Sequence, residues 1–584
     1  MAGGFIKTTK QSALKQVSLI IKVAGLGLVI GITGAILANA FVAGVQWLND
    51  ALLVAFLNQV KEEYSLAIIV AATVAVPTLG GLLVGILLRS VKEQRAHTPA
   101  DIIAAVQTRR GRLPLRPAIL SGLAALVSLG SGASVGQYGP LVHMGGSLGS
   151  AWGRLFRADV TLDNIAIACG VAAAISTVFN APIAGILFAH EVILRHYAFR
   201  AFAPVAVASV VGYLAANVIL PQPPLLYIEA ASVLHHWEYG LFLLLGIASA
   251  LLAVGYMQAI LLASRVAQRW SLPNVFKPAF AGALLGLMAL WVPEILGVGG
   301  ETLRLIFVEG SFGAADLLIL LVLKLIATAL CLGFGFAGGV FSPALLIGSL
   351  FGALFGTLLG MVLGDSVALS SLAVYAVCGM IAVTAPVIGA PLSTVVIIFE
   401  LTGNYELTIA ALASVALANL FASQWFDRSL FDRQLRDRGL DLSGGRSKAL
   451  LMSRSIQDLT SDRYLSLPEQ VTVGEACRSM AQVDSSDAYI VDANQRYLGT
   501  VHLASLIGID VESAAKAYII AEDCAIQADT SLWTAMVVLR NFIGEGVPVI
   551  DAQQHIVGAV FESDLIRAYL DLMEDMRKEE YAAP

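Results

Sequence analysis

The chain has 584 residues, of which 57% are hydrophobic and 13% charged, and its mean hydropathy is +0.79. These values exceed those of soluble globular proteins, so they exclude a wholly soluble chain and indicate one that crosses a membrane several times. The formal net charge of −6 is divided unevenly, because residues 1–431 hold 22 basic and 18 acidic side chains whereas residues 432–584 hold 14 and 24. We therefore expect a membrane part followed by a chemically different part.

Residues 1–16 are rich in lysine and precede the first apolar stretch without a small-residue cleavage site, which predicts a retained cytoplasmic segment. Five apolar stretches are long enough to cross a bilayer, namely Val23–Val45, Leu66–Leu88, Ala201–Leu220, Tyr239–Leu262 and Asp316–Leu332. Other hydrophobic segments are short or interrupted by Gly and Pro. Interrupted helices at membrane depth indicate a transport pathway, because they are tolerated where they line a cavity or are buried in protein.

A second basic loop follows the second stretch, and we place it in the cytoplasm on the same grounds; its residues are Arg109, Arg110, Arg112 and Arg116.

The stretch Gly136–Pro140 reads Gly-Gln-Tyr-Gly-Pro and predicts the start of a helix. Glycine permits the turn, and Pro140 suits the first helical position, where its missing N–H has no cost. The same design returns 203 positions later at Gly339–Pro343. Two helix N-termini inside a bilayer would each present N–H donors and a partial positive charge, so we expect an anion site between them.

A second pair of motifs shows that the membrane part is duplicated. Gly170, Ala181-Pro182 and Glu191 recur 209 positions later as Gly379, Ala390-Pro391 and Glu400. The membrane part, residues 17–431, is therefore interpreted as two repeats at about 17–220 and 239–431. The matched positions of the two glutamates favour a structural role for them, as helix caps or as a pair.

After Phe431 the pattern changes to that of a soluble α/β protein. Residues 432–451 read as a linker, residues 452–510 and 511–576 as two similar small modules, and residues 577–584 as a tail. The segment Tyr497–Val501 and the helix predicted after it are repeated as His555–Val560 and a second predicted helix.

These residues resemble two known families. The membrane part resembles the CLC anion channels and transporters, and the second part resembles a tandem CBS domain pair. The resemblance covers nearly the whole chain and implies a polytopic α-helical membrane protein with CLC-type inverted repeats and a cytoplasmic α/β CBS pair. It also implies a homodimer in which each subunit holds its own pore. The family binds its anion with backbone amides, here those of Val340 and Phe341, with Gly339 supplying the turn and Pro343 the helix start.

The first motif departs from the family at its gate. The family carries a glutamate between Gly-Lys/Arg and Gly-Pro, whereas this chain has Tyr138, preceded by Gln137 and followed by Gly139. A phenol has a reference pKa of about 10, so it cannot repeat the protonation cycle of a carboxylate, although its hydroxyl can donate to an anion. We interpret Tyr138 as a neutral gate; the alternative is an aromatic side chain that only packs.

The family's inner proton-relaying glutamate is also replaced, because Val192 occupies its position after Glu191. Without either titratable group we expect a passive, proton-uncoupled anion channel or uniporter. The alternatives are a proton-coupled exchanger that uses His190, a bicarbonate- or nitrate-selective uniporter, and a membrane nucleotide sensor that does not conduct. An enzyme is not expected, since the sequence shows no nucleophile, metal cluster or phosphate loop.

Both side-chain donors to the family's central anion are missing. The resemblance aligns the central serine with Ala96 and the inner tyrosine with Phe431, and neither carries a hydroxyl. His97 or Thr98 is an alternative donor, or merely a polar loop residue. The backbone amides would then provide the main attraction, with chloride as the family default and another small monovalent anion as the alternative.

The second part offers one nucleotide-site candidate. Asp564 matches the ribose-binding aspartate of CBS domains, but Phe561 replaces the usual threonine, and the first module has His502 and Ser505 where Thr and Asp would stand. A dimerising cap is favoured over adenine nucleotide regulation, and no cofactor or metal is expected for transport itself.

The expected surroundings follow from the same resemblance. We expect an integral protein of the inner or plasma membrane with cytoplasmic termini, whose partners are the anion, lipid and a second copy of the chain but no nucleic acid. The dimer contact is predicted on short helix faces near Ala184, Leu187, Thr394 and Ile397.

Overall fold

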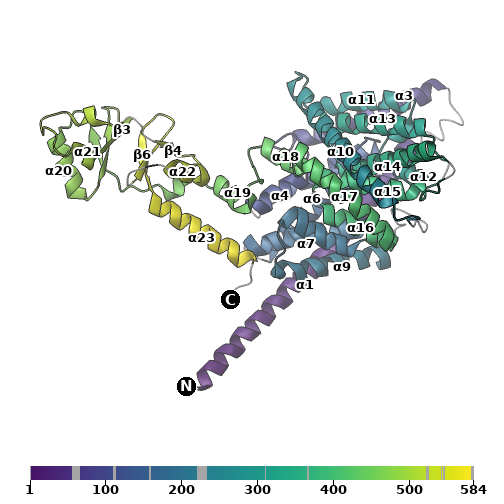
Figure 1. Cartoon of the computed structure of the whole chain (residues 1–584), viewed down its shortest axis with the longest axis horizontal. Coiled ribbons are helices and arrows are strands. Elements are labelled where there is room, and N and C mark those ends of the chain that lie inside the picture. The colour runs from purple at the N-terminus through teal and green to yellow at the C-terminus, as the bar shows by residue number, and fades with distance from the viewer. Residues whose placement is uncertain are drawn as a thin grey trace. The chain divides into compact units, whose positions relative to one another are not determined.

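The computed structural model describes the chain in ten ranges: 2–54, 66–108, 113–156, 160–219, 233–308, 311–364, 367–520, 525–540 with 542, and 546–580. Residues 109–112 of the second basic loop and residues 581–584 of the tail lie outside them, as do the side chains of the first 23 residues. The chain divides into two compact units, Met1–Arg438 and Gly439–Pro584, each of which is described by itself (Figure 1).

The first unit consists of helices, and their order repeats. The first half contains α1 (Ala2–Asn49), α3 (Leu66–Arg89), α4 (Pro99–Gln107), α5 (Leu115–Gly130), α6 (Tyr138–Leu155), α7 (Val160–Phe179), α8 (Pro182–Phe188) and α9 (Phe199–Leu214). The second half contains α10 (Glu238–Arg269), α11 (Lys277–Ala289), α12 (Gly300–Ile306), α13 (Ala314–Gly333), α14 (Phe341–Leu363), α15 (Leu372–Ile388), α16 (Pro391–Thr402), α17 (Tyr405–Trp425) and α18 (Leu430–Asp437).

Within the described ranges, eight helices are long and apolar enough to cross a membrane. Each of the five stretches predicted from the sequence lies largely within one of these helices. The other three helices are Leu162–Phe179, Phe341–Leu363 and Tyr405–Asp437. The broken helices α8 and α16 are too short to cross, as the Pro and Gly interruptions predicted.

The two repeats are related by inversion, which the equivalent helices α8 and α16 show directly. The Glu400 carboxylate, near the end of α16, accepts hydrogen bonds from the backbone N–H groups of Ile183 and Ala184 in the first turn of α8, both at 2.8 Å. In return Glu191, just after α8, accepts from the N–H groups of Leu392 and Ser393 at 3.0 and 2.9 Å. Each helix end caps the start of its counterpart, so the two helices are antiparallel and the predicted structural role of both glutamates is confirmed.

Glycines allow equally close packing in both repeats. A Cβ added to Gly149 of α6 would lie 2.0 Å from the carbonyl oxygen of Ala166 in α7. The counterpart in the second repeat, Gly352 of α14, would meet the carbonyl oxygen of Tyr375 in α15 at 2.1 Å. The small-residue spacing therefore brings each helix against the backbone of the next one.

Three of the four residues near which the dimer contact was predicted are buried within the single chain, and the fourth, Leu187, is half-buried. Ala184, Thr394 and Ile397 are buried inside the single chain, because α8 and α16 pack against each other with these residues turned inward. The apolar side chains that these two helices leave exposed are Ile183, Leu392 and Phe399.

The second unit contains two small sheets with the same design. The first has the order β1 (Ser466–Pro468), β2 (Asp487–Val491) and β3 (Tyr497–His502), and the second has β4 (Ile526–Gln527), β5 (Gly546–Ile550) and β6 (Ile556–Phe561). In each sheet the first pair is parallel and the second antiparallel, with a register shift near the end of the middle strand. The helices around them are α19 (Gly445–Ser453), α20 (Val473–Val483), α21 (Leu503–Leu506), α22 (Leu532–Leu539) and α23 (Glu562–Glu580).

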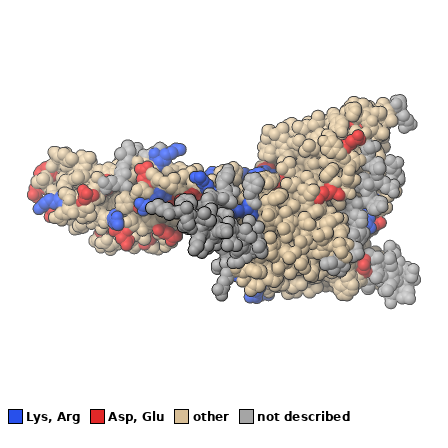
Figure 2. Space-filling view, turned by 90° about the horizontal axis from the view of Figure 1, so that it is seen from below, with Lys and Arg blue, Asp and Glu red and all other residues tan. Residues whose placement is uncertain are grey.

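The two units also differ in surface chemistry. On the face drawn in Figure 2, a broad area of the helical unit carries few charged side chains, whereas both signs of charge are scattered over the α/β unit. An apolar surface of this kind suits contact with lipid.

Candidate functional site

The glycine motifs of the two repeats meet at one point. The N–H of Gly136 donates to the carbonyl of Gly339 at 2.7 Å, and the N–H of Gly339 donates to the carbonyl of Gly136 at 2.6 Å. A side chain cannot be added here without a clash, because a Cβ on Gly339 would lie 2.7 Å from the backbone nitrogen of Gly139. The two turns that open α6 and α14 are therefore joined backbone to backbone.

Both helices begin two residues earlier than predicted. Helix α6 starts at Tyr138 and α14 at Phe341, so Pro140 and Pro343 occupy the third helical position instead of the first. The proline is still without cost, since the first four N–H groups of a helix have no partner inside it. The start is earlier because the carbonyls of Gln137 and Val340 already accept the first helical hydrogen bonds.

Backbone donors gather at these two helix starts. The N–H of Gln137 is engaged by the hydroxyl of Ser342 at 3.3 Å, which crosses from one motif to the other. In the part of the chain that the structure describes, the N–H groups of Val340 and Phe341 have no hydrogen-bond acceptor. Unpaired amides at a helix N-terminus are suited to an anion.

Three aromatic rings lie together at these helix starts. The Tyr138 ring lies 4.2 Å from that of Phe179 and 5.2 Å from that of Phe341, and the latter two are 5.1 Å apart (centroid distances). Tyr138 is only 2% exposed. Its hydroxyl is paired with the side chain of Gln137. We call Tyr138, Phe179 and Phe341 the aromatic triad.

Two members of the triad, Phe179 and Phe341, border an apolar pocket between α14, α15 and α16. Its lining includes Phe179, Phe341, Leu345, Met380, Ile398 and Leu401. Among the described residues its lining carries no charged side chain, and Thr394 is its one polar member.

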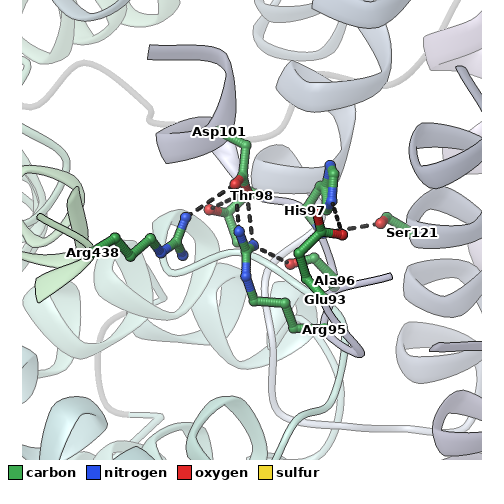
Figure 3. A network of polar contacts seen from close by, with 8 residues as sticks. All are labelled: Glu93, Arg95, Ala96, His97, Thr98, Asp101, Ser121 and Arg438. Atoms are coloured by element: carbon green, nitrogen blue, oxygen red, sulfur yellow. Dashed lines mark hydrogen bonds and ion pairs between the residues drawn. The ribbon is translucent and has the colours of Figure 1, made fainter. Parts of the chain in front are cut away.

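The loop before α4 forms a dense polar network (Figure 3). Arg95 makes two bonds to the Asp101 carboxylate, at 3.0 and 2.6 Å, and Arg438 adds a third at 3.0 Å. The N–H of Thr98 donates to the same carboxylate at 2.7 Å. Burial would raise the pKa of Asp101, but the hydrogen bonds and positive charge of the two guanidinium groups outweigh it and lower that pKa overall.

Ala96 and its neighbours have different environments in this network. The carbonyl of Ala96 accepts from Arg95 at 3.1 Å, and its methyl group offers no donor. The Thr98 hydroxyl lies 3.4 Å from Asp101 and points toward the carboxylate. The N–H of His97 donates to the hydroxyl of Ser121 at 2.9 Å.

Phe431 lies in the first turn of α18. It is buried, and among the described residues its ring makes no ring contact with Tyr138 or Phe341. The helix start is held by Ser429, whose hydroxyl accepts from the N–H of Asp432 at 3.1 Å, and by an ion pair between Asp432 and Arg195 at 2.7 Å.

Sequence reasoning did not single out two residues near the site. Phe179 directly precedes the Asn180-Ala181-Pro182 block. The sequence shows this position but not the ring contacts with Tyr138 and Phe341. Lys324 of α13 is 1% exposed and donates to the carbonyls of Ile295 and Gly297, both at 2.8 Å. The N–H of Gly297 in turn donates to Gly132, four residues before the first motif, at 2.8 Å.

Comparison with known proteins agrees with this geometry. Residues 80–423 match the model of a family described as "Voltage gated chloride channel", and residues 518–571 match the model of the CBS domain. The "Voltage-gated ClC-type chloride channel ClcB" of Escherichia coli (strain K12 / DH10B) is 29% identical over 346 residues, which cover 57% of this chain and 79% of that protein.

Solved structures show the same fold. A "slow cyanobacterial Cl-/H+ antiporter" has a TM-score of 0.64 at 21% identity and covers 71% of this chain and 97% of its own. A "eukaryotic CLC transporter" has a TM-score of 0.62 at 19% identity and covers 94% and 98%. At these identities the likeness concerns the fold alone.

Proposed function

This chain belongs to the voltage-gated chloride channel (CLC) family, and from that premise we propose that it conducts a small monovalent anion passively, as a channel or uniporter that moves no protons in exchange. Chloride is the first anion to test, and nitrate and bicarbonate are the competitors. Family members are channels and transporters, which also argues against an enzyme.

The observation that carries the proposal is the side chain at the gate. Tyr138 is closed in by Phe179 and Phe341, and a phenol with a reference pKa of about 10 stays neutral at physiological pH. Anion passage past such a gate needs the rings to separate, with no protonation step. The unpaired N–H groups of Val340 and Phe341 supply the attraction for the anion.

The inner side supports the same proposal. Val192 is buried and has no proton to give. Glu191, beside it, accepts three hydrogen bonds at the start of α16, two from backbone N–H groups and one from the Ser393 hydroxyl at 2.5 Å. These three bonds engage the Glu191 carboxylate in capping the start of α16.

One specific observation favours the rival, a proton-coupled exchanger. His190 is 1% exposed and its Nδ1 lies 3.0 Å from the carbonyl of His196, while its Nε2 is buried without a partner among the described residues. A relay through His190 would need that nitrogen to exchange protons with the anion route.

The deciding experiment reconstitutes the full chain in liposomes and records chloride and proton movement together. With a potassium ionophore present, we expect chloride efflux without proportional proton uptake. A proton gradient alone should not drive chloride uphill. Protons moving in fixed ratio with chloride, and lost in His190→Gln, would establish the exchanger instead. Absent anion flux with intact nucleotide binding would favour a non-conducting sensor.

We further propose a homodimer in the inner or plasma membrane with both termini in the cytoplasm. Each subunit would hold its own triad, and the exposed Ile183, Leu392 and Phe399 are candidates for the contact between subunits. Mass measurement of the protein in nanodiscs, and protease accessibility of the two termini in sealed vesicles, test the two statements.

For the CBS pair we propose Asp564 as the residue that would hold the ribose of an adenine nucleotide. It lies in the first turn of α23 with a side chain that is 30% exposed, 3.6 Å from Arg567. A melting-temperature rise of the full chain with ATP that disappears in Asp564→Ala supports the site. Unchanged melting in both proteins favours a purely structural cap, and transport itself is expected to need no cofactor.

A further inference from the structure

One face of α6 is turned toward α4 close to the gate. Its residues are Gly139, His143 and Gly146, which follow the i, i+4, i+7 spacing of a single helix face. A Cβ added to Gly139 would lie 2.7 Å from the Cα of Gly339 and 3.8 Å from Pro99, and one added to Gly146 would lie 2.7 Å from Ile102. His143 lies one helical turn after Gly139, between the close approaches of the backbone at Gly139 and Gly146. It is the polar side chain on this face of α6.

The imidazole of His143 is buried without a partner. It is 1% exposed, and neither Nδ1 nor Nε2 has a hydrogen-bond partner among the residues that the structure describes. Every imidazole carries at least one N–H donor, and buried polar atoms nearly always find a partner. The unpaired N–H of the His143 ring therefore indicates a bound ligand that accepts a hydrogen bond from it.

A second imidazole lies against the first. The rings of His97 and His143 have centroids 5.4 Å apart and stand at 86° to each other. His97 is held by its backbone bond to Ser121 and by its Nε2, 3.3 Å from the Glu93 carboxylate (Figure 3). The Glu93 side chain is 45% exposed, so titratable groups run from the surface to His143.

The fixed charges around the pair are balanced, because the carboxylates of Asp101 and Glu93 offset the guanidinium groups of Arg95 and Arg438. The charged or titratable groups that act on His143 are Asp101 and Arg95 from the α4 side, and His97. Asp101 is paired with both Arg95 and Arg438. Helices α1, α5, α7 and α14 also pack against α6, and within the described ranges they present no charged group to His143.

We propose that His97 and His143 form a second anion-binding position, one helical turn from the Gly136–Gly339 contact, which fills when the pair holds a proton. A ring nitrogen takes the proton from water by way of Glu93, and the resulting N–H donates to the anion. The positive charge of the imidazolium and the negative charge of the anion compensate each other in the buried site. The proton stays on the protein, and no covalent bond to the anion forms or breaks.

This position rests on the proposed passive conduction and adds a regulation to it. If the anion binds only to the protonated pair, its apparent dissociation constant rises by about tenfold per pH unit once most pairs are neutral, because the competent fraction falls tenfold. Anion flux should therefore be larger at acidic pH without any proton crossing the membrane.

The test measures binding and flux separately. Purified full-length protein is titrated with sodium bromide by calorimetry at pH 4.5, 5.5 and 6.5, and liposome flux is recorded at the same values. We expect the wild type to bind more tightly and conduct faster as pH falls, and His143→Gln to lose both trends. His97→Gln repeats the test if His143→Gln does not fold. The matched control is His190→Gln, another buried imidazole, which should keep the pH trends.

The outcomes are distinct. Bromide affinity that is independent of pH in the wild type, or pH trends that persist in both His143→Gln and His97→Gln, would overturn the proposal. Loss of the trends in His190→Gln alone would also overturn it. Coupled proton movement in the wild type would refute passive conduction, whereas the calorimetric trend and its loss in His143→Gln would still decide the binding position.

Discussion

Replacing Tyr138 with alanine removes the ring that closes the aromatic triad. The ring makes two contacts, with Phe179 and Phe341, and is almost completely buried. On the proposed passive route, the anion passes when these contacts break. The variant removes both contacts and leaves the amides of Val340 and Phe341 in place, so we expect a faster flux that remains uncoupled from protons.

The size of the effect follows from the ring contacts. An aromatic pair contributes about 0.5–1.5 kcal/mol beyond burial, so two pairs contribute about 1–3 kcal/mol to the closed arrangement. That energy corresponds to a change of about 5- to 150-fold in the ratio of open to closed gates. Loss of so large a buried side chain also lowers the free energy of unfolding by about 3–5 kcal/mol, which a thermal melt should register.

The assay is chloride efflux from liposomes at equal protein content, with Tyr138→Phe as the matched control. Phenylalanine keeps both ring contacts and loses only the hydroxyl that pairs with Gln137. We expect the Phe variant to stay close to the wild type and the Ala variant to exceed both. If folded Tyr138→Ala were no faster than the wild type, or if the Phe variant were as fast, the reasoning from ring packing would be refuted.

Three further predictions concern stability, each measured as a melting temperature in detergent. Glu191→Ala and Glu400→Ala should each cost about 0.5–2 kcal/mol, the usual value of a lost helix cap, while a variant of an exposed glutamate such as Glu512→Ala should not. Lys324→Met should lower the free energy of unfolding by about 1–3 kcal/mol for each carbonyl left without its donor, and Lys324→Arg should recover part of this loss. Equal melting temperatures of Lys324→Met and the wild type would contradict this role of Lys324. Because the folded state lowers the pKa of Asp101, its stabilisation should be complete above about pH 4 and be lost as pH falls further, a loss that Asp101→Asn should reduce.

Motifs and repeats could be predicted because their physics is local. The Gly136–Pro140 and Gly339–Pro343 turns need glycine at defined positions, so their spacing alone indicated the duplication and the paired helix starts. The capping role of the glutamates followed from their matched places. In each case the residue types of a short stretch of chain determine its local conformation, so the sequence predicts it.

The remaining features depend on contacts between distant segments. Phe179 lies beside Tyr138 because α7 ends where α6 begins in space, which no spacing in the sequence reveals. The burial of Ala184 and Thr394, which were named for the dimer contact, is decided by how α8 meets α16. His143 was not singled out, although its spacing from Gly139 and Gly146 matched one helix face, since a single histidine has no signature of its own.

The exchange of caps between α8 and α16 bears on how the chain is made. A ribosome delivers Glu191 about 200 residues before Leu392 and Ser393 exist, and the first turn of α8 waits as long for Glu400. Until then a carboxylate and several amides sit in or near lipid without partners. The first repeat is therefore an unfinished intermediate during biosynthesis, and a chain truncated between the repeats should be a target for membrane quality control.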